Sequence, residues 1–229
     1  MTRRLALAVY GSLMLAGSAG AQVGHLPANS PFRDLEYTQE LTLIGGQQVT
    51  HRDIADVAPR DGAIVGLHYE WRAAGPAHLI GEIAAINSDR RVVNPFLVGA
   101  ARDLGTVRRP LYSANVGLGL SLTGGKSWHN LVPEIAGGLG LISDLRTQAD
   151  TGGFKFGTRF ALTWGGGIRL VPRGRWQLRA DVTNRMYTIA YPEAFYITPN
   201  GGTAVVPAQQ SRSFWTINPA FTLGISRLF

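Results

Sequence analysis

The fold of this chain is decided by a stretch near its middle, Tyr112-Ser-Ala-Asn-Val-Gly-Leu-Gly-Leu-Ser-Leu122. Every second residue of the stretch is Tyr, Ala, Val or Leu, and the residues between them are Ser, Asn or Gly. A period of two places the apolar residues on one face of a β-strand. About ten residues of tilted strand are enough to cross a membrane. The stretch therefore predicts a transmembrane strand with one lipid-facing side.

Seven further segments show the same alternation, some of them more weakly. In chain order they cover residues 37–44, 63–72, 77–86, 131–142, 156–170, 176–183 and 221–226. The total of eight is even, as in bacterial single-chain barrels. We therefore predict an all-β fold, a closed antiparallel up-and-down transmembrane β-barrel of about eight strands. Residues 92–98 are apolar enough to form one arm of an extra hairpin, so ten strands are the alternative.

The connections between the predicted strands alternate in length. The long ones cover residues 46–61, 87–110, 143–155 and 192–212, and the short ones cover residues 74–76, 123–130 and 172–175. Bacterial barrels have long extracellular loops and short periplasmic turns. The observed order fits that plan. A secreted β-sandwich is the other fold that this composition allows, but that fold gives no reason for long and short connections to alternate.

The composition agrees with a membrane wall made of strands. Charged residues make up 16% of the chain, against roughly 25% in typical soluble domains. The formal net charge of +7 is not gathered in one run, which favours contact with an anionic lipid surface over nucleic-acid binding. The chain has no Cys, and this excludes thiol-based metal and redox sites.

The N-terminus has the pattern of a secretory signal. Arg3 and Arg4 precede an apolar run from Leu5 to Leu15, and the small residues Ala19-Gly-Ala21 follow. The run is too short for a membrane-spanning helix, which needs about 20 residues, so an uncleaved anchor is the less favoured alternative. We predict a signal peptide over residues 1–21, a periplasmic segment over residues 22–36 and the barrel over residues 37–229.

Aromatic residues gather near the predicted strand ends, as in the two interfacial girdles of membrane barrels. The predicted periplasmic girdle contains Tyr37, Trp71 and Trp176, and the predicted outer girdle contains Tyr112, Phe154, Phe156, Tyr187, Tyr191 and Trp215.

The last nine residues, Phe221-Thr-Leu-Gly-Ile-Ser-Arg-Leu-Phe229, carry a more specific signal. The terminal Phe229, preceded by Phe221, Leu223 and Ile225 in alternation, resembles the C-terminal assembly signal of outer-membrane barrels; Arg227 departs from that pattern. In strand number and loop order the chain is similar to the small OmpA/OmpX-like barrels. This resemblance implies an outer-membrane location, contact with outer-membrane lipids and lipopolysaccharide, and insertion by the barrel-assembly machinery. It also implies a monomer that binds no nucleic acid.

Charged side chains of both signs face the predicted interior. They are Glu40, His68, Glu70, Arg72, His78, Glu82, Glu134, Arg159, Arg169, Arg179, Asp181 and Arg185. An eight-stranded barrel is just wide enough for side chains to fill, and ions in such an interior must be paired. We therefore expect a salt-bridged plug and a non-enzymatic role in membrane structure or surface contacts. The alternative is a narrow, gated, porin-like pore.

A third function is an acyltransferase-like barrel that modifies lipid A. His51 in the first long loop could meet Ser88 and Asp89 of the second at the outer rim. A deacylase-like site is disfavoured because no His is predicted on the lipid-facing wall. No metal-ligand spacing or nucleotide fingerprint is present. We predict no catalytic residue, no metal and no cofactor.

Overall fold

The computed structural model describes residues 30–229, and the barrel unit extends from Arg33 to Phe229. The predicted signal peptide, residues 1–21, and residues 22–29 of the predicted periplasmic segment lie outside the described residues. Within residues 30–229, no helix has the length and apolar character needed to cross a membrane.

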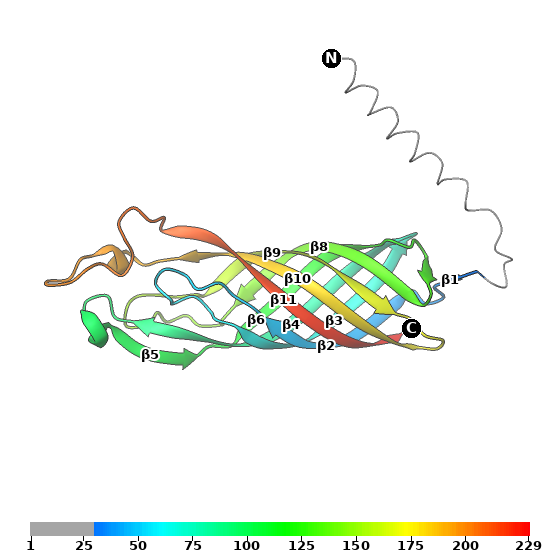
Figure 1. Ribbon diagram of the computed structural model, residues 1–229, viewed down its shortest axis with the longest axis horizontal. Coiled ribbons are helices and arrows are strands. Elements are labelled where there is room, and N and C mark those ends of the chain that lie inside the picture. Colours follow the sequence, from blue (N-terminus) through cyan, green and yellow to red (C-terminus); the bar gives the residue numbers. More distant parts are fainter. Residues whose placement is uncertain (1–29) are drawn as a thin grey trace, which may run out of the picture. The chain divides into compact units, whose positions relative to one another are not determined.

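Eight long strands form the wall of the barrel (Figure 1). They are β2 (Gln39–Gln48), β3 (Gly62–Ala74), β4 (Ala77–Val93), β6 (Leu111–Ser121), β8 (Leu131–Ser143), β9 (Thr158–Leu170), β10 (Trp176–Ala190) and β11 (Ser213–Leu228). Each strand pairs antiparallel with the next, and β11 pairs with β2 to close the ring. The predicted fold class, a closed up-and-down barrel, is confirmed.

The remaining elements are short. They are β1 (Phe32–Asp34), β5 (Asp103–Arg108), β7 (Lys126–Trp128) and the 3-10 helices η3 (Gly99–Arg102) and η4 (Glu193–Tyr196). Strand β4 continues past its last pair with β6, Ile86 with Leu111, and its far end pairs with β5. An extra hairpin therefore exists, but it projects beyond the wall. The ten-strand alternative is wrong.

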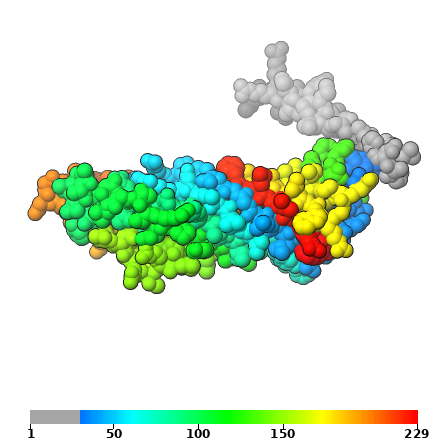
Figure 2. Space-filling view, turned by 90° about the horizontal axis from the view of Figure 1, so that it is seen from below, coloured from blue at the N-terminus to red at the C-terminus, as the bar shows by residue number. Residues whose placement is uncertain are grey.

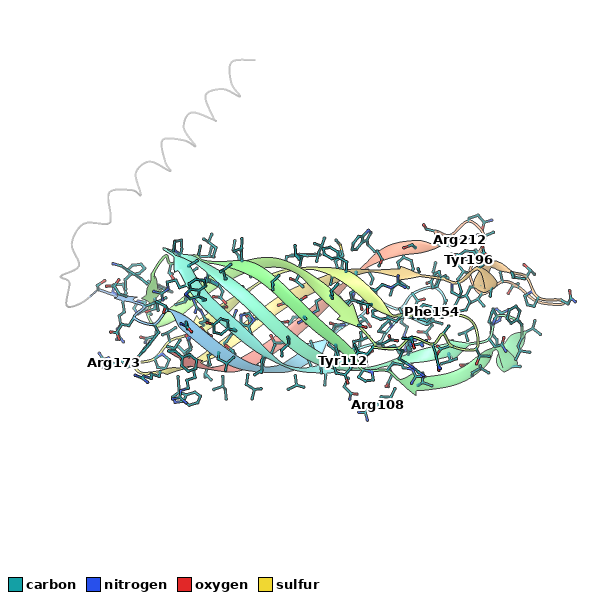
Figure 3. All side chains as sticks on the ribbon, turned by 180° about the vertical axis from the view of Figure 1, so that it is seen from behind. Arg108, Tyr112, Phe154, Arg173, Tyr196 and Arg212 are labelled. Carbon is teal, nitrogen blue, oxygen red and sulfur yellow. The ribbon has the colours of Figure 1, made fainter. Side chains whose placement is uncertain are left out.

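The two ends of the barrel differ (Figure 1). One end, which we call the short-turn end, carries the connections after β3, β6 and β9. The opposite, long-loop end carries the four long connections, and Figure 3 shows Arg173 at the first end and Tyr196 and Arg212 at the second. In Figure 2, the green and orange atoms at the long-loop end belong to the second and fourth long connections. There Arg102 donates a hydrogen bond to the carbonyl of Thr203.

The alternation in the sequence separates the outer from the inner surface of the wall. On β11, Leu223 is 70% exposed whereas the adjacent Thr222 is 7% exposed; on β6, Val116 is 62% exposed and Asn115 is 8% exposed. The outward side chains are mainly apolar on all eight strands, and leaving them in water costs about 25 cal/mol per Å². The outer surface is thus suited to hydrocarbon and the inner surface to polar contacts.

Several residues of the predicted girdles are exposed on the outside of the barrel. Trp71 and Trp176 are exposed near the short-turn end, and Tyr112 and Trp215 are exposed on the long-loop half. Tyr37 is half-buried, with the guanidinium carbon of Arg175 6.0 Å from its ring centroid.

Four of the predicted outer-girdle aromatics are buried instead: Tyr187, Tyr191, Phe154 and Phe156. Tyr187 follows Arg179 and Arg185 in the inward register of β10, so the period of two places it inside. Phe156 departs from the period of two because Gly157, with a φ of 64°, interrupts the extended backbone before β9 begins. These residues belong to the interior and not to the membrane interface.

Candidate functional site

The inward faces of the strands carry a group of ionisable side chains in the half of the barrel nearer the short-turn end. We call it the ion cluster, and its members are Glu40, His68, Glu70, His78, Glu82, Glu134, Arg169, Arg179, Asp181 and Arg185. Six of the eight wall strands, all except β6 and β11, supply these residues. The cluster brings together ten of the twelve residues predicted for the interior.

Arg179 on β10 is the centre of the cluster. Its guanidinium donates hydrogen bonds to Glu70 on β3 and to Glu134 on β8. Its Nε donates to Oδ2 of Asp181 at 2.7 Å, and its Nη1 lies 3.8 Å from Oε1 of Glu40. One buried cation therefore joins strands on opposite sides of the ring.

Arg169 on β9 is the second bridging cation. Its Nη1 donates to Oε2 of Glu40 at 2.8 Å, and its Nε lies 3.0 Å from Oε2 of Glu134. Its Nη2 donates to Oγ of Ser121 at 3.2 Å. Gln177 donates to the same oxygen of Glu40 at 2.6 Å. Oε2 of Glu40 is thus held by two donors, and Oγ1 of Thr42 donates to Oε1 at 3.0 Å.

A second layer of ion pairs lies farther from the short turns. Nη2 of Arg185 donates to Oε1 of Glu82 at 2.7 Å. His68 lies between two carboxylates, with Nε2 2.8 Å from Oε1 of Glu70 and Nδ1 3.3 Å from Oε2 of Glu82. The imidazole therefore connects the Arg185 pair to the pairs around Arg179.

Two arginines of the predicted interior set stand apart from the cluster. Arg72, near the short-turn end, donates from Nη1 to the carbonyl of Leu35 at 2.7 Å. Arg159, near the long-loop end, donates from Nε to the carbonyl of Phe156 at 2.8 Å. Neither contacts a carboxylate of residues 30–229. The alternation of their strands turns both side chains inward. At their heights along the barrel axis, however, no carboxylate is within reach.

Inward glycines provide the room that these long side chains need. An added Cβ on Gly119 would lie 2.0 Å from Nε2 of His78, and one on Gly167 would lie 2.0 Å from Oδ1 of Asp181. Beside the cluster, further glycines line a cavity of about 60 Å³ together with Asn115, Thr163 and the cluster residues Glu82, Arg179 and Asp181. This volume holds a few water molecules at most.

An apolar plug fills the other half of the interior, toward the long loops. Its largest members are Phe154, Phe156, Tyr187, Tyr191 and Phe195. The ring centroid of Phe195 lies 6.5 Å from that of Phe154 and 6.0 Å from that of Tyr191, and Phe156 meets Tyr187 edge to face at 5.6 Å. The long loops therefore fold back over the open end of the barrel. Sequence reasoning missed this plug, because Phe154 and Tyr191 resemble interface anchors when position alone is considered.

Polar contacts hold the plug in place. The hydroxyl of Tyr191 donates to Oδ2 of Asp53 at 2.6 Å and so links the fourth long loop to the first. Burial, together with this carboxylate, raises the pKa of Tyr191, so the phenol remains a hydrogen-bond donor. Arg90 pairs with Asp150, and its guanidinium carbon lies 5.0 Å from the ring centroid of Phe154. Three of the four long loops are thereby tied to the plug.

The residues considered for lipid chemistry are not arranged as a nucleophile and its base. Oγ of Ser88 is directed at the carbonyl of Arg60, to which it donates at 2.7 Å, and the side chain is fully buried. His51 is exposed in the first long loop. A base must lie within hydrogen-bond reach of the hydroxyl that it activates. Ser88 and Asp89 are instead part of strand β4, where they pair with Gly62 and Arg108.

Comparison with known proteins gives likeness at the level of structure. No family model and no curated protein sequence match the chain. Among solved structures, the outer membrane protein OprG from Pseudomonas aeruginosa has a TM-score of 0.51 and 12% identity, over 84% of this chain and 97% of that one. Neisserial surface protein A has a TM-score of 0.47 and 11% identity, over 87% and 98% of the two chains. Ail from Yersinia pestis has a TM-score of 0.37 and 15% identity, over 85% and 100%. The chain thus has the fold of a small eight-stranded outer-membrane β-barrel.

Proposed function

We propose that the protein is an integral barrel of the outer membrane with a closed interior, and that it acts in membrane structure and surface contacts and not as an enzyme. The observation that carries this proposal is the double filling of the barrel. The ion cluster occupies one half of the interior, and the apolar plug occupies the other. The cavity beside the cluster measures only about 60 Å³. A solute would have to displace both to pass.

The outside of the barrel supports a membrane location and a monomer surrounded by lipid. Apolar side chains face outward on each strand, and exposed Trp71 and Trp176 lie near the short-turn end. Arg108 and Lys155 are exposed at the long-loop end, where they are suited to the phosphates of lipopolysaccharide. Phe221, Leu223, Ile225 and Phe229 are exposed on the outside of the barrel, and we propose that the barrel-assembly machinery recognises them.

A planar-bilayer recording tests the closed interior. The full mature protein, folded in detergent, is added to the bilayer, and its insertion is verified by its presence in the recovered membrane. We expect no discrete current steps beyond those of a protein-free detergent control, because ions crossing the barrel would meet both fillings. Reproducible steps of one size would contradict the proposal and favour the narrow pore.

A further inference from the structure

Three side chains of the ion cluster converge from three different strands. Glu70 on β3, His78 on β4 and Glu134 on β8 place one potential ligand atom each within 4.8 Å of one another. Nε2 of His78 lies 3.6 Å from Oε2 of Glu70 and 3.7 Å from Oε2 of Glu134. The imidazole nitrogen is thus directed between the two carboxylate oxygens, but it is beyond hydrogen-bond distance of both.

Two of these atoms are buried without a hydrogen bond, although Oε2 of Glu134 keeps an ion pair with Nε of Arg169 at 3.0 Å. Nε2 of His78 and Oε2 of Glu134 accept or donate no hydrogen bond within residues 30–229, and the two residues are only 4% and 3% exposed. Nε2 of His78 has no partner within hydrogen-bond distance, and a buried polar atom in that state is destabilising. His68 differs, because it has a carboxylate within hydrogen-bond distance of each ring nitrogen. His68 has the geometry of a hydrogen-bond donor, and His78 has that of a ligand.

The net charge of the cluster also favours a bound cation. Its five carboxylates, from Glu40, Glu70, Glu82, Glu134 and Asp181, face the guanidinium groups of Arg169, Arg179 and Arg185. His68 has a carboxylate at each ring nitrogen and so donates from both as an imidazolium. With His78 neutral, the carboxylates are in excess by one charge. A surplus of this kind is expensive in a low-dielectric interior. A cation bound among these carboxylates would offset it.

We propose that Glu70, His78 and Glu134 form a binding site for a divalent transition-metal ion of the zinc class. Imidazole nitrogen and carboxylate oxygen are suitable ligands for this class, with bonds of about 2.0–2.2 Å. Tetrahedral bonds of that length place ligand atoms about 3.3–3.5 Å apart. The distances of 3.6 and 3.7 Å from His78 need only a small contraction. The fourth position is left for water.

Arg169 is the cation that faces this site most closely. Its Nε lies 3.0 Å from Oε2 of Glu134, and its Nη1 lies 3.5 Å from Oε2 of Glu70. The guanidinium also donates hydrogen bonds to Glu40 and Ser121. We expect a metal ion held by the two Oε2 atoms to displace Arg169 toward these other partners. Arg179 binds the opposite oxygens, Oε1 of Glu70 and Oε1 of Glu134, and leaves the Oε2 atoms available.

The test uses the untagged mature protein, folded in detergent in the presence of Co²⁺ or Zn²⁺ and then passed through a desalting column. We expect one ion per barrel, with a Co²⁺ absorption spectrum of tetrahedral type. Loss of a residue that only supports a ligand can weaken metal binding by roughly 100-fold. Because His78 is itself a proposed ligand, His78→Gln should weaken binding by about 100-fold or more. His129→Gln is the matched control, because His129 lies in a short turn, and it should bind like the unaltered protein.

Three results would overturn the metal site: no retained ion, unchanged binding by His78→Gln, or an equal loss in the control. Should His78→Gln fail to fold, X-ray absorption of the Zn²⁺-loaded unaltered protein decides the matter. Scattering from one imidazole supports the site, and its absence contradicts it. None of these readouts depends on whether the barrel conducts, so the outcome is separate from that of the bilayer recording.

Discussion

Replacing Arg179 with methionine should destabilise the folded barrel by about 3–5 kcal/mol, the usual cost of removing one partner from a buried ion pair. The guanidinium is the donor for Glu70, Glu134 and Asp181, each on the inner surface of the wall. Methionine fills part of the volume but leaves these carboxylates without their main cation. The loss is therefore electrostatic and not a matter of packing.

Urea-induced unfolding in detergent, followed by tryptophan fluorescence, measures this effect. Arg173→Met is the matched control, because Arg173 is exposed in the short turn before β10 (Figure 3), and it should change stability by less than about 0.5 kcal/mol. Adding Glu134→Gln to the Arg179→Met variant should restore part of the loss, since one unpaired charge is removed. Equal stability of the Arg179 and Arg173 variants would show that the cluster does not hold the barrel together.

Replacing Phe195 with alanine should cost about 3–5 kcal/mol and loosen the long loops, as expected for a large aromatic removed from a packed core. Phe195 lies in η4, is 0% exposed, and contacts the rings of Phe154 and Tyr191. Its removal leaves a cavity under the fourth long loop. The strands of the wall should stay paired, because the ion cluster lies in the other half of the barrel.

Limited proteolysis with urea unfolding separates these two effects. The Phe195→Ala variant should be cut faster within the fourth long loop, while the wall remains resistant. Phe96→Ala is the control, since Phe96 is 60% exposed in the second long loop and should give the cutting rate of the unaltered protein. If both variants behaved alike, the apolar plug would not be a packed core.

The wall of the barrel could be predicted because its two environments oppose each other. Each strand has lipid-compatible residues on one face and polar residues on the other. A period of two in the sequence therefore predicts both the strand and the direction in which each side chain points. The same alternation predicts which charged residues face the interior. The alternation does not give the height of a residue along the barrel axis, however. For this reason it groups Arg72 and Arg159 with carboxylates that they do not reach.

The loops and the convergence of side chains could not be predicted in the same way. Tyr191 and Phe154 lie next to strand ends, where an aromatic residue packs equally well against lipid or beneath a loop. The folded course of the long connections decides between the two, and no periodicity encodes that course. Glu70, His78 and Glu134 lie on separate strands, and their approach depends on strand register and on the space beside Gly119.

The account depends most on the assignment of the outer face to hydrocarbon and the inner face to protein. Magnetisation transfer from lipid acyl chains to methyl groups measures this in the unaltered protein, embedded in a bilayer and labelled on its methyl groups. We predict strong transfer to the outward methyl groups of Leu223 and Ile225, and none to the inward methyl groups of Ile44 and Ile64. Comparable transfer to Ile44 or Ile64 would contradict the account.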